Sequence, residues 1–437
     1  MPTTKPSLFS AEYDRRQVFR FAGAGGLALA SASLLAACTG TSGGGGGSSS
    51  SKTTTVGSNY SDPGVKSAFG AVTKAFDKSS GDTLKVNTVS HNDFQNNINN
   101  YLQGSPDAVF TWFSGFRMKS YAKSGLTLPL DDVWSKIGSN FSDSIAKAST
   151  ADDGKKYLVP WVTYPWAVFY SKSLFADKGY EVPVKWDDFK SLAAQMKKDG
   201  LIPIAFADKD LWPACGTFDY LNMRINGYQF HVDLMAHKES WNQAKVKDVF
   251  DHWNEILPFH QTGALGRIWQ DAANAIGTKK AGMMVVGSDQ IGVQLTGAQY
   301  DDLDFFAFPE INPDYGQTAV EAPIDGFMMS KKGANDKVAT AFLEYLGTAK
   351  AQQTYLGVNK ADIATAKNAD TSNYTALQKK AQSFIGDAKD LSQFLDRDSL
   401  PAFASDVMEP ALQSFISSGT FDMASVESQA KQKYASN

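Results

Sequence analysis

The sequence predicts an α/β fold built on an open sheet with helices on its faces. Short apolar runs alternate with segments whose apolar residues recur every three to four positions, which is the pattern of strands alternating with amphipathic helices. Of the 437 residues, 43% are apolar and 20% are charged, a composition typical of a chain with a large buried core. Strands joined through helices pair in parallel, and ligands of such sheets bind beyond the carboxyl ends of the strands.

The first strand–helix–strand unit follows residue 56. Pro63 stands at a helix start, and Gly81 ends the helix after four apolar residues at helical spacing. Residues 83–89 then alternate as a strand, and a second helix precedes a strand over 108–112. The apolar faces of the two helices are Val65, Phe69, Val72 and Phe76 in the first, and Phe94, Ile98 and Leu102 in the second.

The same alternation continues along the chain. It predicts one long extended stretch over 157–169, a helix over 186–200, strands over 201–207, 283–286 and 326–330, a helix over 337–346 and further helices in the last hundred residues. Cys215 is the one cysteine in this part of the chain, so we expect it to be a small core or near-site residue without a disulfide partner.

The first 55 residues have the composition of an export and anchoring segment. Arg15 and Arg16 precede the uncharged run 21–37, which ends in Leu-Ala-Ala followed by Cys38. The paired arginines resemble a twin-arginine signal, and the last four residues resemble the lipobox of bacterial lipoproteins. We therefore expect 1–37 to be a signal peptide and Cys38 to be lipidated. Residues 38–55, rich in Gly, Ser and Thr, would form a flexible tether.

Motifs of common enzymes are absent from the sequence. There is no HExxH, GxSxG, P-loop or GxGxxG after a strand, so we predict no catalytic residue, metal site or cofactor. A net charge of −4 offers no electrostatic attraction for nucleic acid. The competing interpretation is an exported polysaccharide hydrolase, which needs two carboxylates about 5–10 Å apart in a cleft.

Tryptophans occur in two kinds of position. Trp134, Trp186, Trp241 and Trp253 fall at helical core spacing, and we assign them to cores. The others interrupt extended segments or follow strands, where aromatic faces beside polar side chains suit the apolar face and hydroxyl edge of a sugar. Those that we expect to face a sugar are Trp112, Trp166 and Trp212.

Several segments, in order and spacing, resemble one family over nearly all of residues 56–437. They are 105–112 with 121–125, 154–160 with 169–172, 184–189, 279–284 with 287–289, and 325–327. The chain resembles the extracellular solute-binding proteins of ABC importers, in the carbohydrate-binding class that includes maltose-binding protein. Two positions depart from the family pattern, because Asp289 replaces a frequent Trp and Asp325 replaces a frequent Gly.

The resemblance implies a two-lobed fold with a ligand cleft between lobes joined by hinge segments. Lobe I would comprise 56–163 and 309–368, and lobe II 166–307 and 372–437, with crossings near Thr163, Phe308 and Thr371. The expected ligand-binding residues are His91, Asn92, Asp93, Trp112, Phe113, Arg117 and Asp325 from lobe I, and Trp166, Trp212, Ser288, Asp289, Gln290 and Arg397 from lobe II.

The function implied by the resemblance is capture of a carbohydrate, expected to be a di- or oligosaccharide, and its delivery to an ABC transporter permease. The protein would be a monomer held at the outer face of the bacterial cytoplasmic membrane through Cys38, without enzymatic activity. A polyol, an amino sugar or another polar solute remains an alternative ligand for the same fold.

Overall fold

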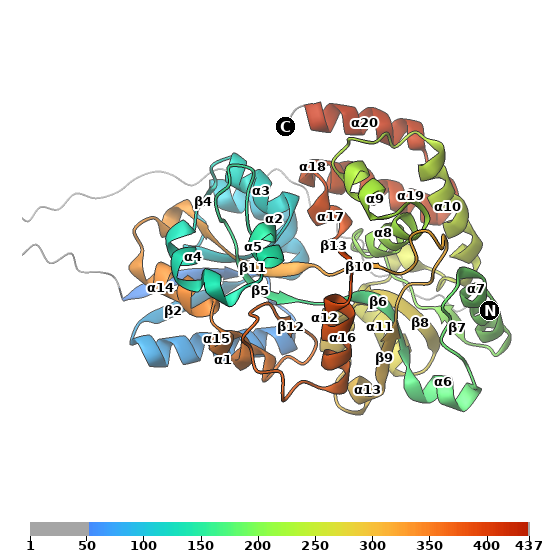
Figure 1. Ribbon diagram of the computed structural model, residues 1–437, viewed down its shortest axis with the longest axis horizontal. Helices are drawn as coiled ribbons and strands as arrows, with labels where there is room; N and C mark the ends of the chain where they lie inside the picture. The colour runs from blue at the N-terminus through green and yellow to red at the C-terminus, as the bar shows by residue number, and fades with distance from the viewer. Residues whose placement is uncertain (1–51, 436–437) are drawn as a thin grey trace, which may run out of the picture. The chain divides into compact units, whose positions relative to one another are not determined.

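The computed structural model describes residues 52–435, which contain two large β-sheets, one in each of two lobes (Figure 1). Lobe I surrounds a seven-stranded sheet in the order β12-β5-β11-β3-β1-β2, with β4 paired to β11. Its strands are β1 (Thr53–Ser58), β2 (Thr83–Thr88), β3 (Val109–Phe113), β4 (Thr127–Leu128), β5 (Val159–Thr163), β11 (Ile324–Ser330) and β12 (Ile363–Ala364). Its helices are α1 (Pro63–Ser80), α2 (His91–Gln103), α3 (Phe116–Lys123), α4 (Asp131–Ile137), α5 (Asp143–Ala148), α14 (Lys337–Leu346) and α15 (Ala349–Leu356), with the 3-10 turns η1 (Gly138–Asn140) and η4 (Lys331–Gly333).

Lobe II surrounds a four-stranded sheet in the order β7-β8-β6-β9. Its strands are β6 (Trp166–Ser171), β7 (Ile202–Ile204), β8 (Ala281–Gly287) and β9 (Leu303–Phe306). Its helices are α6 (Lys172–Lys178), α7 (Trp186–Lys198), α8 (Pro213–Asn226), α9 (Tyr228–Met235), α10 (Ala244–Ile256), α11 (Trp269–Gly277), α12 (Ser288–Gln294), α13 (Ala298–Asp301), α16 (Ala376–Gly386), α17 (Leu395–Asp398), α18 (Pro401–Phe403), α19 (Glu409–Ser418) and α20 (Met423–Ala435), with the short turns η2 (Leu257–Phe259), η3 (Ala264–Gly266) and η5 (Ala404–Met408).

The predicted strand–helix–strand unit is confirmed in lobe I. β1 pairs in parallel with both β2 and β3, and Val56 is opposite Val86 on one side and Val109 on the other. α1 ends at Gly81, whose φ of 75° is the left-handed conformation that favours glycine. Because the carboxyl ends of β1 and β2 meet at one sheet edge, the residues that follow these strands lie together there.

The long extended stretch predicted over 157–169 consists of two strands in different sheets. β5 pairs with β11 in lobe I, whereas β6 pairs with β8 and β9 in lobe II. Tyr164 and Pro165 separate the strands, and Pro165 has no N–H to donate to a ladder. This pair of residues therefore carries the chain from one lobe to the other.

The second passage between the lobes lies later than the crossing that we expected near Phe308. Phe308 is fully buried in lobe II, where its ring stacks on Tyr220 at a centroid distance of 5.3 Å. The chain stays on lobe II as far as Asn312, whose N–H donates to the Arg224 carbonyl. It then forms β10 (Ala319–Glu321), which pairs in parallel with β13 (Asp390–Ser392), before entering β11. Because the Phe308 side chain packs into the apolar core of lobe II, the chain leaves this lobe after residue 308 and not at it.

The tryptophans assigned to cores are buried, as predicted. Trp241 and Trp253 are fully buried in the lobe II core, and Trp186 is 5% exposed in the same core. Trp134 packs in a second core, which contains apolar residues of both lobes. Cys215 is buried in α8 without a disulfide. Burial, together with nearby carboxylates, raises the pKa of its thiol.

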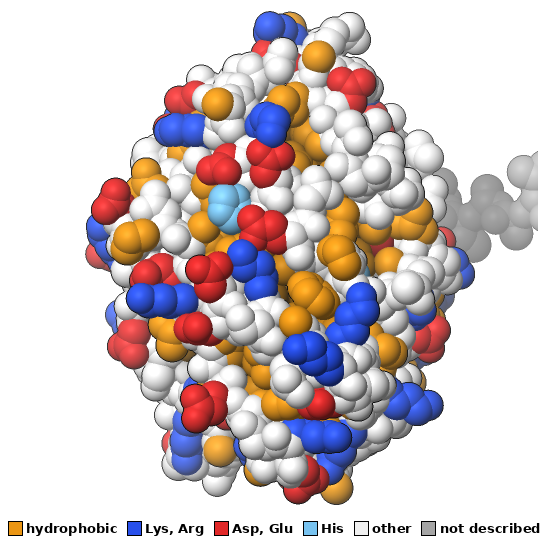
Figure 2. All heavy atoms as spheres, turned by 90° about the vertical axis from the view of Figure 1, so that its right-hand side faces the viewer, with side chains coloured by type: hydrophobic (Ala, Val, Ile, Leu, Met, Phe, Trp, Pro, Cys, Tyr) orange, Lys and Arg blue, Asp and Glu red, His pale blue; other side chains and the backbone are white. Residues whose placement is uncertain are grey.

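Charges of both signs are interspersed with apolar side chains over the face of lobe II in Figure 2. On its helices, exposed pairs such as Lys247 with Asp251 join residues one turn apart. Such exposed pairs contribute little to stability. Within residues 52–435, no helix combines the length and the apolar character that a membrane span requires.

Candidate functional site

A cavity of about 840 Å³, open solvent at its mouth included, lies between the two lobes, and we call it the interlobe cavity. Its polar and aromatic side chains come from both lobes. From lobe I they are Asn59, Tyr60, Ser61, Asp62, Ser90, His91, Asn92, Asp325, Tyr355 and Asp362, and from lobe II Trp212, Trp269, Gln270, Asp289 and Gln290. Val65, Val162 and Val293 complete the wall.

Among the hollows that share residues with the interlobe cavity, two contain further expected site residues. The adjoining cavity, of about 300 Å³, shares His91, Trp212 and Gln290 with it. The adjoining cavity also includes Gln95, Tyr164, Trp166, Phe394, Asp396 and Arg397. The outer groove, of about 1250 Å³ including open solvent, shares only Asn92 and Trp212 with the interlobe cavity.

The lobe I side of the cavity is built at the carboxyl ends of parallel strands. Asn59 and Tyr60 directly follow β1, and Ser90 and His91 follow β2 at the start of α2. Ser90 caps α2 by accepting a hydrogen bond from the Asp93 N–H. The Thr111 hydroxyl of β3 accepts from the Asn59 N–H at 2.9 Å. The parallel topology therefore fixes these polar residues along one edge of the sheet.

Of the four aspartates that line the interlobe cavity, Asp289, Asp325 and Asp362 interact with one another. Burial, followed by the carboxylates of Asp362 and Asp325, raises the pKa of Asp289. Burial and Asp325 raise the pKa of Asp362 to about 8. The pKa of Asp325 is raised by burial although Arg397 opposes the shift. With a pKa of about 8, Asp362 is mostly protonated at neutral pH, so its carboxyl group offers a hydroxyl donor beside the two other aspartates.

Arg397 is the cation of this cluster. Its Nη1 donates to Asp325 Oδ1 at 2.7 Å, and its Nη2 donates to the Tyr164 hydroxyl at 3.0 Å. The guanidinium also lies 4.0 Å above the centre of the Phe113 ring. Since Arg397 is 7% exposed, these three contacts fix its side chain in place.

A second arginine connects lobe I to α17. Arg117 on α3 donates through Nε to the Asp396 carbonyl at 2.9 Å, and its Nη2 lies 3.0 Å from Asp396 Oδ2. Its Nη1 donates to the side-chain carbonyl of Gln95. Arg117 therefore positions α17, which carries Arg397.

Aromatic rings line the lobe II side. Trp166 packs edge-on against Trp212 at a ring-centroid distance of 6.2 Å, and its ring centroid lies 4.7 Å from that of Phe394. Trp166 is 2% exposed, whereas Trp212 is only partly buried and borders all three hollows. Trp269 adds a second lobe II indole to the interlobe cavity. Trp212 therefore presents the more accessible ring.

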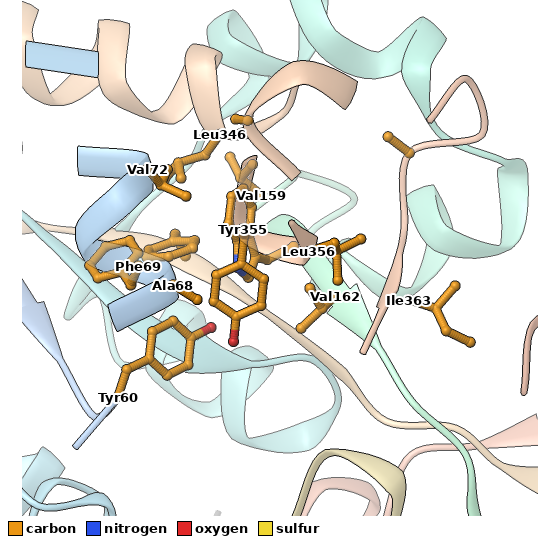
Figure 3. Packing of buried hydrophobic residues seen from close by; sticks show 14 of the residues in the cluster. Tyr60, Ala68, Phe69, Val72, Val159, Val162, Leu346, Tyr355, Leu356 and Ile363 are labelled. Atoms are coloured by element: carbon orange, nitrogen blue, oxygen red, sulfur yellow. The ribbon is translucent and has the colours of Figure 1, made fainter. Parts of the chain in front are cut away.

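Tyr60 and Tyr355 connect the cavity to the core beneath it. Their rings pack 6.1 Å apart beside Phe69 and Val162, and Figure 3 shows their hydroxyl groups pointing toward one another. Both residues line the interlobe cavity. The two tyrosines thus place polar groups on an apolar base.

Several polar side-chain atoms of the cavity residues are buried without a hydrogen-bond partner among residues 52–435. They are Asn59 Oδ1, the Tyr60 hydroxyl, Trp212 Nε1, Gln290 Oε1 and Asp362 Oδ1. Buried polar groups are normally paired, so each of these atoms leaves a hydrogen bond that water, a ligand or a local rearrangement can supply. Together with the polar side chains of its wall, they make the interlobe cavity a candidate polar binding site.

The structure brings most of the expected site residues together. His91, Asn92, Trp212, Asp289, Gln290 and Asp325 line the interlobe cavity, and Trp166 and Arg397 line the adjoining cavity. Burial followed by the two arginines lowers the pKa of His91 to about 4, so its ring is neutral at pH 7 and offers one donor and one acceptor. These residues remain the candidate ligand contacts.

The remaining expected residues lie beside the site. Trp112 is 1% exposed in an apolar cluster with Phe94 and Tyr121, and it borders the outer groove, not the interlobe cavity. It alternates along β3 with Phe113, which lies under Arg397. Arg117 borders the outer groove, Ser288 donates to the Ala361 carbonyl, and Asp93 lies in the first turn of α2.

Twelve of the eighteen residues that line the interlobe cavity were not predicted from the sequence. Asn59 and Tyr60 follow the first strand, so the rule that ligands bind beyond strand ends would have identified them. Trp269, Tyr355 and Asp362 had no such signal, because Trp269 and Tyr355 lie on helices and Asp362 lies in the turn before β12.

Comparison with known proteins matches this architecture. The family model described as bacterial extracellular solute-binding protein matches residues 61–353. The bacterial solute receptor AcbH, reported to have an exclusive substrate preference for β-D-galactopyranose, is 47% identical. It superimposes with a TM-score of 0.86 over 87% of this chain and 99% of that chain.

Curated relatives are more distant in sequence. An uncharacterised ABC transporter extracellular-binding protein of Pyrococcus horikoshii is 25% identical over 331 residues, which cover 74% of this chain and 73% of that protein. The multiple sugar-binding protein of Streptococcus mutans is 25% identical over 222 residues, about half of either chain (48% and 51%). With its two lobes, its interlobe cavity and a family match over more than half its length, this chain belongs to the bacterial extracellular solute-binding proteins.

Proposed function

We propose that the protein captures a carbohydrate in the interlobe cavity and delivers it to the permease of an ABC importer. The observation that carries the proposal is a cavity between the lobes whose wall combines many polar side chains with the Trp212 and Trp269 rings. A sugar has an apolar C–H face for such rings and hydroxyls that donate and accept hydrogen bonds. The similarity to AcbH makes D-galactose the first candidate ligand.

The cavity residues suggest a role for each group in sugar binding. The Trp212 ring would stack on a sugar face, worth roughly 1–3 kcal/mol once desolvated. Asp289, Asp325 and Asp362 would exchange hydrogen bonds with hydroxyls, and charge-assisted bonds of this kind are the stronger ones. Arg397 would keep Asp325 oriented while it does so.

Ligand capture by both lobes implies a change in their separation. Contacts from lobe I and lobe II act on one sugar together only when the lobes are closed, and a ligand shifts such an equilibrium through its higher affinity for the closed form. We propose that the passages at 164–165 and at β10 and β13 provide the hinge.

The expected export signal, the lipidated Cys38 and most of the tether lie outside the described residues. We retain them as part of the proposal on sequence grounds, since Arg15, Arg16 and the run 21–37 followed by Cys38 have the order of an exported lipoprotein. The protein would then act as a monomer at the outer face of the cytoplasmic membrane.

A thermal-shift screen tests the carbohydrate assignment. Mono-, di- and trisaccharides would be added to the purified protein, together with polyols and amino acids. We expect at least one sugar to raise the melting temperature, because a ligand that binds only the folded state stabilises it. We also expect the sugar to be recovered chemically unchanged, as binding without hydrolysis requires. If no sugar raises the melting temperature while another solute does, the ligand is not a carbohydrate. If the sugar is recovered cleaved, the hydrolase alternative is favoured.

Replacing Trp212 with Ala is expected to weaken sugar binding at least tenfold, about 1.4 kcal/mol, while leaving the protein folded. The indole is only partly buried, so its loss removes a ligand contact more than it removes core packing. Isothermal titration measures the affinity, and Trp253→Ala, in the lobe II core, is the contrasting variant that should lower stability instead. An unchanged titration for Trp212→Ala would remove this ring from the site.

A further inference from the structure

Besides the pairing of Arg397 with Asp325, other side-chain contacts at the interlobe cavity join lobe I to lobe II. At its boundary with the outer groove, Asn92 Nδ2 of α2 donates to Asp210 Oδ1, in the turn between β7 and α8, at 2.9 Å. Elsewhere on the wall, the Gln270 side chain of α11 lies beside the carboxyl group of Asp62, the residue that precedes α1, and opposes the rise that burial gives to its pKa. Both contacts therefore connect opposite sides of the cleft.

The first contact belongs to a thin partition. Asn92 from lobe I and Trp212 from lobe II line the interlobe cavity on one side and the outer groove on the other. Within residues 52–435, these are the side chains common to the two hollows. A saccharide that continued from the cavity into the groove would have to separate Asn92 from Asp210.

The second contact lies in a different part of the wall. Asp62 and Gln270 line the interlobe cavity but neither the adjoining cavity nor the outer groove. Beside them, Val65 in the first turn of α1 and Val293 of α12 line the same cavity, and a Cβ added at Gly64 would lie 3.9 Å from Val293 Cβ, so the first turn of α1 is close to lobe II. A ligand leaving in this direction would hold the lobes apart here.

We propose that the contacts of Asn92 with Asp210 and of Asp62 with Gln270 set the length of the bound saccharide and exclude chains of three or more rings. This inference rests on the proposed carbohydrate function. It narrows the expected ligand, a di- or oligosaccharide, to sugars of fewer than three rings. A short sugar lets both contacts form while the lobes close on it. A longer chain loses one contact and part of the closure that makes binding favourable.

The test compares monosaccharides with their trimers. D-galactose, β-1,4-galactotriose, D-glucose and maltotriose would be titrated into the wild-type protein and into Asn92→Ala and Gln270→Ala. Asp210→Ala removes the first contact from the other lobe. Asn96→Ala, one turn along α2 and lining only the outer groove, is the matched control.

We expect the wild type to bind one monosaccharide at least 100-fold more tightly than its trimer. Each contact variant should reduce that ratio at least tenfold, and Asn96→Ala should keep it within twofold. Because the readout is a ratio, a general loss of affinity does not imitate the effect.

Two results would overturn the proposal: equal affinity of the wild type for monomer and trimer, or an unchanged ratio in the contact variants. If none of the four sugars binds but the thermal-shift screen identifies another sugar, the length inference fails for these series while the carbohydrate function stands. If no sugar binds at all, both fail.

Discussion

Arg397→Ala is expected to lower the free energy of unfolding by roughly 3–5 kcal/mol at pH 7, the usual result of removing one partner from a buried ion pair. The substitution leaves Asp325, 8% exposed, without its cation and removes the donor to the Tyr164 hydroxyl. Sugar binding should fall at least 100-fold, because Asp325 loses the group that orients it. Urea unfolding and isothermal titration measure the two effects.

The double variant Arg397→Ala with Asp325→Asn is the matched control, because it removes both charges. We expect it to recover part of the lost stability. The loss in free energy of unfolding of Arg397→Ala, relative to the wild type, should also be larger at pH 8 than at pH 5. Without Arg397 the folded-state pKa of Asp325 rises further, and the stability associated with a raised carboxyl pKa is lost as pH increases through it. A single variant as stable as the wild type would show that Arg397 does not compensate the carboxyl cluster.

Asp362→Asn is expected to flatten the dependence of stability on pH. The folded-state pKa of Asp362 is about 8, against about 3.9 in an unfolded chain. Its contribution to stability is therefore fully present below about pH 4 and is lost as pH rises through about 8. Between pH 5 and 8.5 the wild type should lose about 2–4 kcal/mol that the variant retains, since one pKa unit corresponds to 1.36 kcal/mol.

The measurement is urea unfolding of both proteins across that range. The Asn359 side chain donates to Asp362 Oδ2 at 2.6 Å, and the amide oxygen of the replacement can accept the same bond. Asp314→Asn, at an exposed position, is the control that should leave the pH profile unchanged. Parallel profiles for the wild type and Asp362→Asn would mean that Asp362 ionises normally in the folded protein.

Local periodicity was sufficient for the regular elements of the fold. The helix predicted over 337–346 is α14 with the same bounds, because Asp336 caps it and its apolar face packs on lobe I. Periodicity failed where an extended run changes partners, as at Tyr164 and Pro165. Hydrogen bonding between distant strands decides such a change, and a local pattern does not contain it.

Site prediction had the same limit. Trp212 was expected because it follows a strand and His91 because of the family resemblance, and both line the interlobe cavity. Trp112 borders the outer groove instead, because strand alternation turns most of its ring into the core. Asp362 gave no signal, because its proximity to Asp289 and Asp325 depends on three separate chain segments.

The sequence by itself determined the α/β elements, the family resemblance and many of the polar and aromatic residues of the cleft, because these depend on side-chain spacing and residue type. Only the tertiary structure decided which of those residues share one cavity, that Arg397 pairs with Asp325, and that Asn92 reaches Asp210 across the cleft. Such pairings join residues more than 70 positions apart, and packing between lobes, not local propensity, brings them within hydrogen-bond distance.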